Sequence, residues 1–100
     1  MRLKVGQTLE SVVDTTALVV VRCSDEDLSV TCGGHEMVPR GAAKELVPAE
    51  TTGEGTLIGK RYTVDGVGVE LLCVQAGDHP VAVDGTAVVV KSAKPLPASD

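Results

Sequence analysis

The residues in this sequence that are best suited to chemistry are Cys32 and His35, which flank Gly33 and Gly34. A cysteine and a histidine separated by two small residues are typical of a metal knuckle, because a tight turn aims both ligand atoms at one point. Glycine allows the backbone to curl in such a turn. Two ligands are half of the set that a structural zinc or mononuclear iron site needs.

The other two cysteines, Cys23 and Cys73, are the candidates to complete a zinc or iron site, within one chain or across a homodimer. Cys23 ends the strand that precedes the strand of Cys32. Because strands rise about 3.3 Å per residue, the two thiols are expected to lie roughly 10 Å or more apart. This expected distance weakens the case for a site that they share.

A role in the hydrophobic core is the competing interpretation of two of these cysteines, since free cysteine is among the most buried residue types. Cys73 lies within an aliphatic run, and Cys32 continues the apolar face of Leu28 and Val30. The core is therefore the favoured place for both. His35 and His79 are expected to be exposed turn residues.

Cys32 and His35 could also form a thiolate–imidazolium pair, which is the chemistry of a thiol enzyme. A nucleophile needs an oriented base and a pocket, and the sequence indicates neither. No catalytic residue is therefore assigned, and the interpretation favours a protein that is not an enzyme.

The stretch from Leu28 to Met37 resembles the second metal half-site of the desulforedoxin family, which are small rubredoxin-like iron or zinc proteins. Cys32 and Met37 match the first cysteine and the methionine of that half-site. Gly33 stands where the family has its second cysteine, and the upstream Cys-x-x-Cys knuckle is missing. The resemblance implies a bound zinc or iron ion. The Val/Ala/Asp/Gly-rich composition is similar to that of small actinobacterial proteins.

The charge and composition of the chain exclude several classes of function. The net charge is −5, and the chain has one Tyr, no Phe and no Trp. A nucleic-acid binder needs a basic face and aromatic side chains that stack on bases, so a nucleic-acid partner is not expected. No apolar run reaches the roughly 20 residues of a membrane helix, and the first residues lack the apolar centre of a signal peptide. We expect no membrane association, a cytoplasmic location and reduced cysteines.

Valine-rich runs separated by glycine-containing turns predict an all-β fold, a small antiparallel barrel or sandwich of about six to eight short strands. The runs 16–23 and 28–32 are expected to pair as a hairpin, and the continuous apolar character of the first indicates burial on both faces. Two Asp-Gly dipeptides, Asp65-Gly66 and Asp84-Gly85, are typical of type I′ turns and predict two further hairpins.

Residues 39–55 are rich in glycine, proline and small polar residues, which predicts a long loop, with a helical turn possible at 42–46. Residues 1–94 are expected to form one domain, and residues 95–100, with two closely spaced prolines, an extended C-terminal tail.

The function that these features favour is a small, soluble, non-catalytic accessory or interaction domain that acts through a protein partner or self-association as a homodimer. Its core is modest, and an apolar surplus of side chains could be covered by a partner. The alternative is a small zinc or iron protein with its site around Cys32 and His35.

Overall fold

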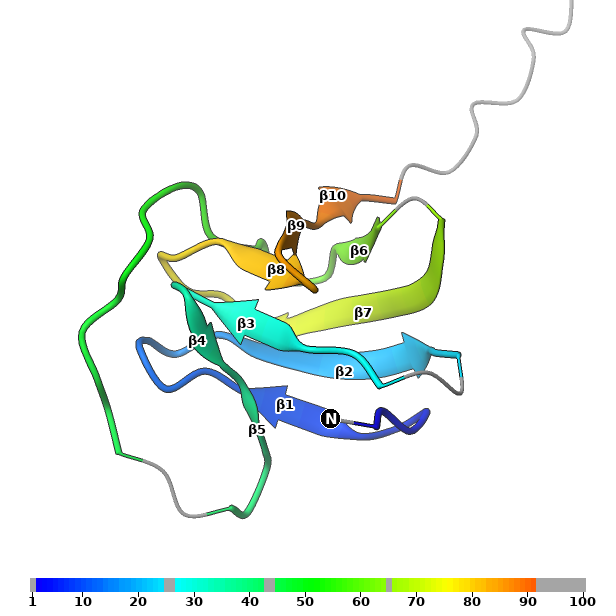
Figure 1. The fold of residues 1–100 in the computed structure, drawn as a ribbon, viewed down its shortest axis with the longest axis horizontal. Coiled ribbons are helices and arrows are strands. Elements are labelled where there is room, and N and C mark those ends of the chain that lie inside the picture. The colour runs from blue at the N-terminus through cyan, green and yellow to red at the C-terminus, as the bar shows by residue number, and fades with distance from the viewer. Residues whose placement is uncertain (1, 25–26, 43–44, 65, 92–100) are drawn as a thin grey trace, which may run out of the picture.

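The computed structural model describes residues 2–24, 27–42, 45–64 and 66–91, and these residues form strands and loops without a helix (Figure 1). The predicted all-β class is confirmed, as a sandwich of two antiparallel sheets rather than a closed barrel. The strands are β1 (Thr8–Glu10), β2 (Ala17–Arg22), β3 (Val30–Cys32), β4 (His35–Glu36), β5 (Val38–Pro39), β6 (Arg61–Val64), β7 (Val67–Gln75), β8 (Val81–Val83), β9 (Thr86–Ala87) and β10 (Val89–Val90).

The larger sheet has the strand order β10-β6-β7-β2-β1-β5, and the smaller sheet has the order β4-β3-β8-β9. Two chain segments pass from one sheet to the other after a single residue. Met37 separates β4 from β5, and its amide donates to the carbonyl of Val30. Val88 separates β9 from β10, and its amide donates to the carbonyl of Val81. Such corners, at which a strand changes sheet, join the layers of the sandwich at both edges.

The expected hairpin of residues 16–23 with 28–32 is wrong. β2 pairs with β1 and β7, whereas β3 pairs with β4 and β8 in the other sheet. Both strands bury one face, and those faces meet across the sandwich instead of lying side by side in one sheet. Alternation in the sequence shows that a strand has an inner face, but it does not show which sheet contains the strand.

The two hairpins predicted at the Asp-Gly dipeptides are present. β6 pairs antiparallel with β7, and β8 pairs antiparallel with β9. Asp84 and Gly85 have φ angles of 49° and 83°, the positive values that a type I′ turn requires at both central positions. Gly66 has a φ of 80°, while Asp65 lies outside the described residues.

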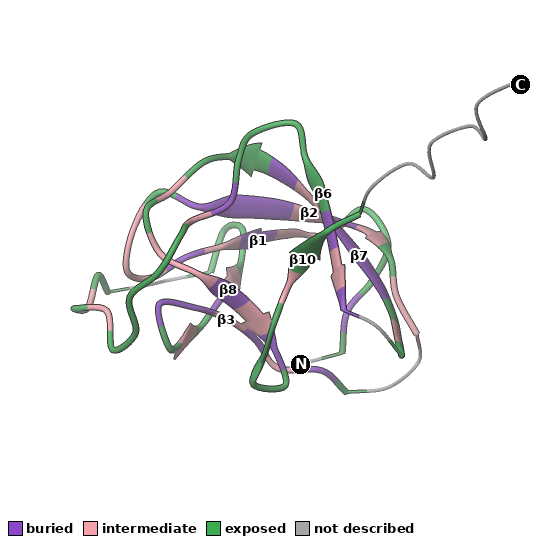
Figure 2. Ribbon diagram, turned by 90° about the horizontal axis from the view of Figure 1, so that it is seen from above, coloured by how far each residue is buried: buried purple, intermediate pink, exposed green. Residues whose placement is uncertain are grey.

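The core lies between the two sheets, and Figure 2 shows buried stretches along β2, β7 and β8 and an exposed β10. Leu18 and Val20 of β2 are fully buried. Val19 and Val21, on the other face, are only partly buried. The sequence predicted burial of both faces of this strand, whereas the structure fully buries only one. The members of the core each expose less than a tenth of their surface: Leu3, Leu9, Leu18, Val20, Leu28, Val30, Cys32, Met37, Tyr62, Val64, Val69, Leu71, Cys73, Val81 and Val83.

The predicted long loop is present as the connection between β5 and β6, which contains no strand in its described part. Backbone hydrogen bonds tie it to the sandwich: the amide of Val47 donates to the carbonyl of Val12, and the amide of Glu50 donates to that of Gly33. The helical turn considered at 42–46 falls partly outside the described residues, and so does the whole of the expected tail at 95–100.

Candidate functional site

The Gly33-Gly34 turn joins β3 to β4, and the two glycines have φ angles of 63° and 88°. These residues were expected to form a turn, and the positive angles explain why both are glycine. Gly33 is also tightly surrounded, since a Cβ atom there would lie 2.8 Å from Cγ2 of Val13 and 3.1 Å from Cβ of Ala49. The β1–β2 connection and the long loop therefore both pack against this turn.

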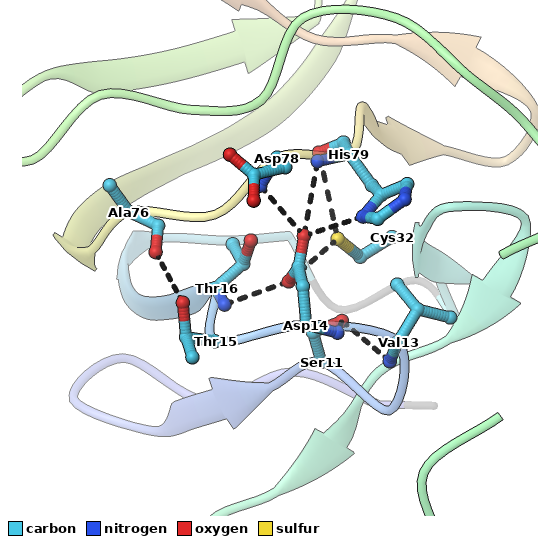
Figure 3. A network of polar contacts seen from close by, with 9 residues as sticks. All are labelled: Ser11, Val13, Asp14, Thr15, Thr16, Cys32, Ala76, Asp78 and His79. Atoms are coloured by element: carbon cyan, nitrogen blue, oxygen red, sulfur yellow. Dashed lines mark hydrogen bonds and ion pairs between the residues drawn. The ribbon is translucent and has the colours of Figure 1, made fainter. Parts of the chain in front are cut away.

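The side chain of Asp14 is the centre of a polar network beside this turn (Figure 3). Its Oδ1 accepts a hydrogen bond from the amide of Thr16 at 2.8 Å. Its Oδ2 accepts from the amides of Asp78 and His79 at 2.9 and 3.0 Å, and lies 2.9 Å from Nδ1 of His79. A carboxylate only accepts hydrogen bonds, so we assign the ring proton of His79 to Nδ1.

Burial alone would raise the pKa of Asp14, whose side chain is 9% exposed. The hydrogen bonds that the carboxylate accepts from Thr16, His79 and Asp78 outweigh this effect and hold its pKa well below the usual range. Asp14 is therefore ionised at neutral pH and anchors two loops that are distant in the sequence.

Cys32 lies at the edge of the same network, with its Sγ atom 3.7 Å from Oδ1 of Asp14 and 3.7 Å from the carbonyl oxygen of His79. The residue is fully buried, and this burial raises the pKa of the thiol; the negative charge of Asp14 raises it further. In a catalytic Cys–His–Asp arrangement the imidazole lies between the thiol and the carboxylate. Here the carboxylate lies in the middle, so the arrangement stabilises a neutral thiol rather than a nucleophilic thiolate.

The structure does not gather the four candidate metal ligands. Cys32 and His35 are opposite each other in the β3–β4 pair. Nε2 of His35 lies 3.9 Å from Oε2 of Glu50. Within the described ranges, no group of three or more His, Cys, Asp or Glu side chains is arranged to hold a metal ion.

The remaining two thiols have contacts of their own. Cys23 Sγ donates to the carbonyl of Leu3 at 3.4 Å. Cys73 Sγ lies 3.2 Å from Oγ1 of Thr56 and 3.3 Å from the carbonyl oxygen of Gln75. Cys32 and Cys73 are both buried, which confirms the favoured core interpretation of each.

The sequence interpretation did not single out Asp14 or Gly77, and it expected His35 and His79 to be exposed turn residues. The side chain of His79 is only 28% exposed and is bound to Asp14, and His35 lies in strand β4 with its side chain 31% exposed, so both expectations are wrong. A local signal was present for Asp14, because an Asp whose carboxylate accepts from the amide two residues later forms an Asx-turn. A Cβ atom at Gly77 would overlap Oγ1 of Thr16, so only glycine lets the β7–β8 connection approach this carboxylate.

A second feature is an open groove of about 750 Å³ at one end of the sandwich, which we call the end groove. Residues 53–57 form one wall, residues 76–78 another, and Tyr62, Val81, Val88 and Val90 the apolar remainder. Leu57 and Val90, which line it, are 59% and 46% exposed. Their chain neighbours Ile58 and Val89 are 66% and 53% exposed.

No family model, curated protein or solved structure matches this chain. Among the residues that the structure describes, no helix is long and apolar enough to cross a membrane. The choice between the polar network and the end groove therefore depends on their geometry.

Proposed function

We propose that this chain is a non-catalytic interaction domain that binds a protein partner in the end groove. The observation that carries this proposal is the exposure of two aliphatic side chains that line the groove, Leu57 at 59% and Val90 at 46%. Scattered exposed aliphatic residues are normal, but exposed aliphatic side chains that line one concave surface are typical of an interaction site.

The polar network supports the non-catalytic part of the proposal. The carboxylate of Asp14 is saturated by hydrogen bonds from Thr16, Asp78 and His79, and the thiol of Cys32 is fully buried. The carboxylate of Asp14 and the thiol of Cys32 therefore lack the access and the free proton-accepting site that general base or nucleophilic catalysis requires.

Site-specific photo-crosslinking in the host cell tests the proposal. A benzophenone side chain is placed at the position of Leu57 or Val90, and, as controls, at Val5 and Leu46, which are more exposed than either groove residue and do not line the end groove. We expect one adduct with the same protein from both groove positions and none from the controls. Val90→Asp should abolish the adduct formed at position 57 without unfolding the chain.

No adduct at either groove position, or the same adducts at all four positions, would overturn the proposal. An adduct of twice the 10.3 kDa chain mass would identify the occupant as a second copy and would also contradict a separate protein partner.

A further inference from the structure

The charged residues that line the end groove are acidic. Glu54 and Asp78 are among its lining residues, and none of the described lysines, arginines or histidines lines it. The nearest cation along the chain from the groove wall at Val90 is Lys91, and its Nζ is engaged by the carboxylate of Glu70. An apolar groove with two carboxylates at its walls complements an apolar segment that carries a positive charge.

Strand β10, which contributes Val90 to the groove, is the last strand of the larger sheet and pairs only with β6 in the described part of the chain. The amide of Lys91 donates to the carbonyl of Arg61, and Val90 lies opposite Tyr62. Because successive residues of a strand direct their backbone groups to opposite sides, the amide and carbonyl of Val90 point away from β6. An unpaired edge of this kind is a template for an added strand.

We infer that the end groove binds an extended, aliphatic segment of a partner protein, which adds a strand beside β10 and places a lysine or arginine against Glu54 and Asp78. This inference rests on the proposed function and specifies the chemistry of the partner. Main-chain pairing supplies affinity in strand addition, and alternate side chains of the added segment supply specificity.

The charge of the groove disfavours a second copy of this chain as the occupant. The net charge of the chain is −5, and two copies that met through this groove would bring two pairs of carboxylates together. Juxtaposed like charges at an interface are unfavourable. A free organic cation fits less well than a peptide, because the groove contains a single aromatic ring, that of Tyr62, whose hydroxyl is engaged by the amide of Leu57.

Selection from a phage library of random linear peptides of about eight residues, the length of a typical strand and its flanks, tests this inference on the full chain. Phage that also bind the Val90→Asp variant are removed first. We expect the selected peptides to alternate aliphatic residues and to be enriched in lysine and arginine. A synthetic peptide of the consensus should bind about tenfold more weakly to the Glu54→Gln/Asp78→Asn double variant, and the difference should shrink as salt is raised to about 1 M.

Glu36→Gln is the matched control, because Glu36 is an exposed carboxylate on β4 that does not line the groove. It should leave the affinity unchanged. Methylation of alternate backbone amides of the peptide should weaken binding at least as strongly as the double variant, since strand addition uses those amides.

The outcomes separate this inference from the function on which it rests. Selected peptides with no preference for basic residues, or a double variant that binds as tightly as the natural chain, would overturn the inference and leave the groove as an interaction site. A failure to select any Val90-dependent peptide, together with adducts at positions 57 and 90 in cells, would also overturn the inference alone. A failure of both experiments would overturn the proposed function as well.

Discussion

Oδ2 of Asp14 lies 2.9 Å from Nδ1 of His79, although 65 residues separate the two in the sequence. This contact joins the β1–β2 connection to the β7–β8 connection, which leads from the larger sheet to the smaller one. The same carboxylate accepts hydrogen bonds from the backbone amides of Thr16, Asp78 and His79. The ionised side chain of Asp14 thus holds the two loops together at a point where none of the described strands pairs them.

Replacement of this carboxylate by an amide should destabilise the protein. Asp14→Asn removes the negative charge and turns one acceptor into a donor that faces backbone amides, so we expect a loss of about 1–3 kcal/mol in the free energy of unfolding. Urea denaturation at neutral pH measures the change. Asp78→Asn is the matched control, because Asp78 is an exposed carboxylate in the same connection, and its side chain should contribute less than about 0.5 kcal/mol. Equal losses in the two variants would contradict the role that we assign to Asp14.

The stability of the natural chain should also depend on pH through Asp14. Its pKa is lower in the folded state than in the unfolded state, so the unfolded state binds the proton first as pH falls. The stabilisation is therefore fully present above the unfolded pKa of roughly 4 and is lost as the pH drops below it. Denaturation midpoints measured from pH 7 downward should fall below about pH 4, and less steeply in Asp14→Asn. Parallel curves for the natural chain and the variant would contradict this prediction.

The close approach of the β7–β8 connection to Asp14 predicts a steric effect at Gly77. A Cβ atom there would overlap Oγ1 of Thr16 and lie 2.6 Å from Oδ2 of Asp14, so Gly77→Ala must displace the connection. We expect a loss of more than about 2 kcal/mol in thermal or urea unfolding, because both loops would separate from the carboxylate. Gly68→Ala is the control, since a Cβ atom at Gly68 would meet only Cβ of Ser24 at 4.0 Å. A Gly77→Ala variant as stable as this control would contradict the packing described here.

The sequence predicted those features that depend on local pattern. Asp84-Gly85 and Gly33-Gly34 require positive φ angles, and the residue types show this directly. The burial of Cys32 and Cys73 followed from their aliphatic neighbours. These features depend on residues that are adjacent in the chain, which is why the sequence contains their signal.

The remaining features depend on residues that are far apart in the chain. The pairing of β2 with β7 instead of β3 is a choice between two ways to bury the same apolar face, and alternation is the same in both. Asp14 and His79 lie in polar, turn-like sequences; an Asx-turn at Asp14 is a local feature, but the contact between the two side chains depends on the tertiary structure. The end groove is formed by residues 53–57, 76–78 and the β8–β10 segment, so no single stretch of sequence predicts it.

The three thiols should differ in their reactivity. Cys23 is partly exposed, whereas Cys32 and Cys73 are buried, and burial raises the pKa of Cys32. Iodoacetamide at neutral pH should therefore label Cys23 first in the folded protein, and label the other two only after unfolding. Mass spectrometry of the digested protein measures this, with urea-unfolded protein as the control for intrinsic reactivity. Rapid labelling of Cys32 in the folded protein would contradict the buried, neutral thiol and would support a thiol enzyme instead.

The only aromatic side chain of the sequence should hold the wall of the end groove in place. The hydroxyl of Tyr62 accepts a hydrogen bond from the amide of Leu57 at 2.8 Å, and the residue is 6% exposed. Tyr62→Phe keeps the ring in the core but removes the acceptor, so we expect a loss of about 1 kcal/mol in local stability at Leu57. Hydrogen exchange of the Leu57 amide should then be about fivefold faster, because local opening exposes it to water more often.

The amide of Gly59 is the internal control for this variant, since it donates to the carbonyl of Cys73 at 2.8 Å and does not depend on the hydroxyl. Its exchange should be unchanged in Tyr62→Phe. Faster exchange at both amides would show that the substitution loosens the whole β5–β6 connection, and unchanged exchange at Leu57 would show that the hydroxyl does not hold this wall. A selective effect at Leu57 would instead place Tyr62 between the core and the groove, where it couples the packing of β6 to the position of an exposed leucine that a partner would cover.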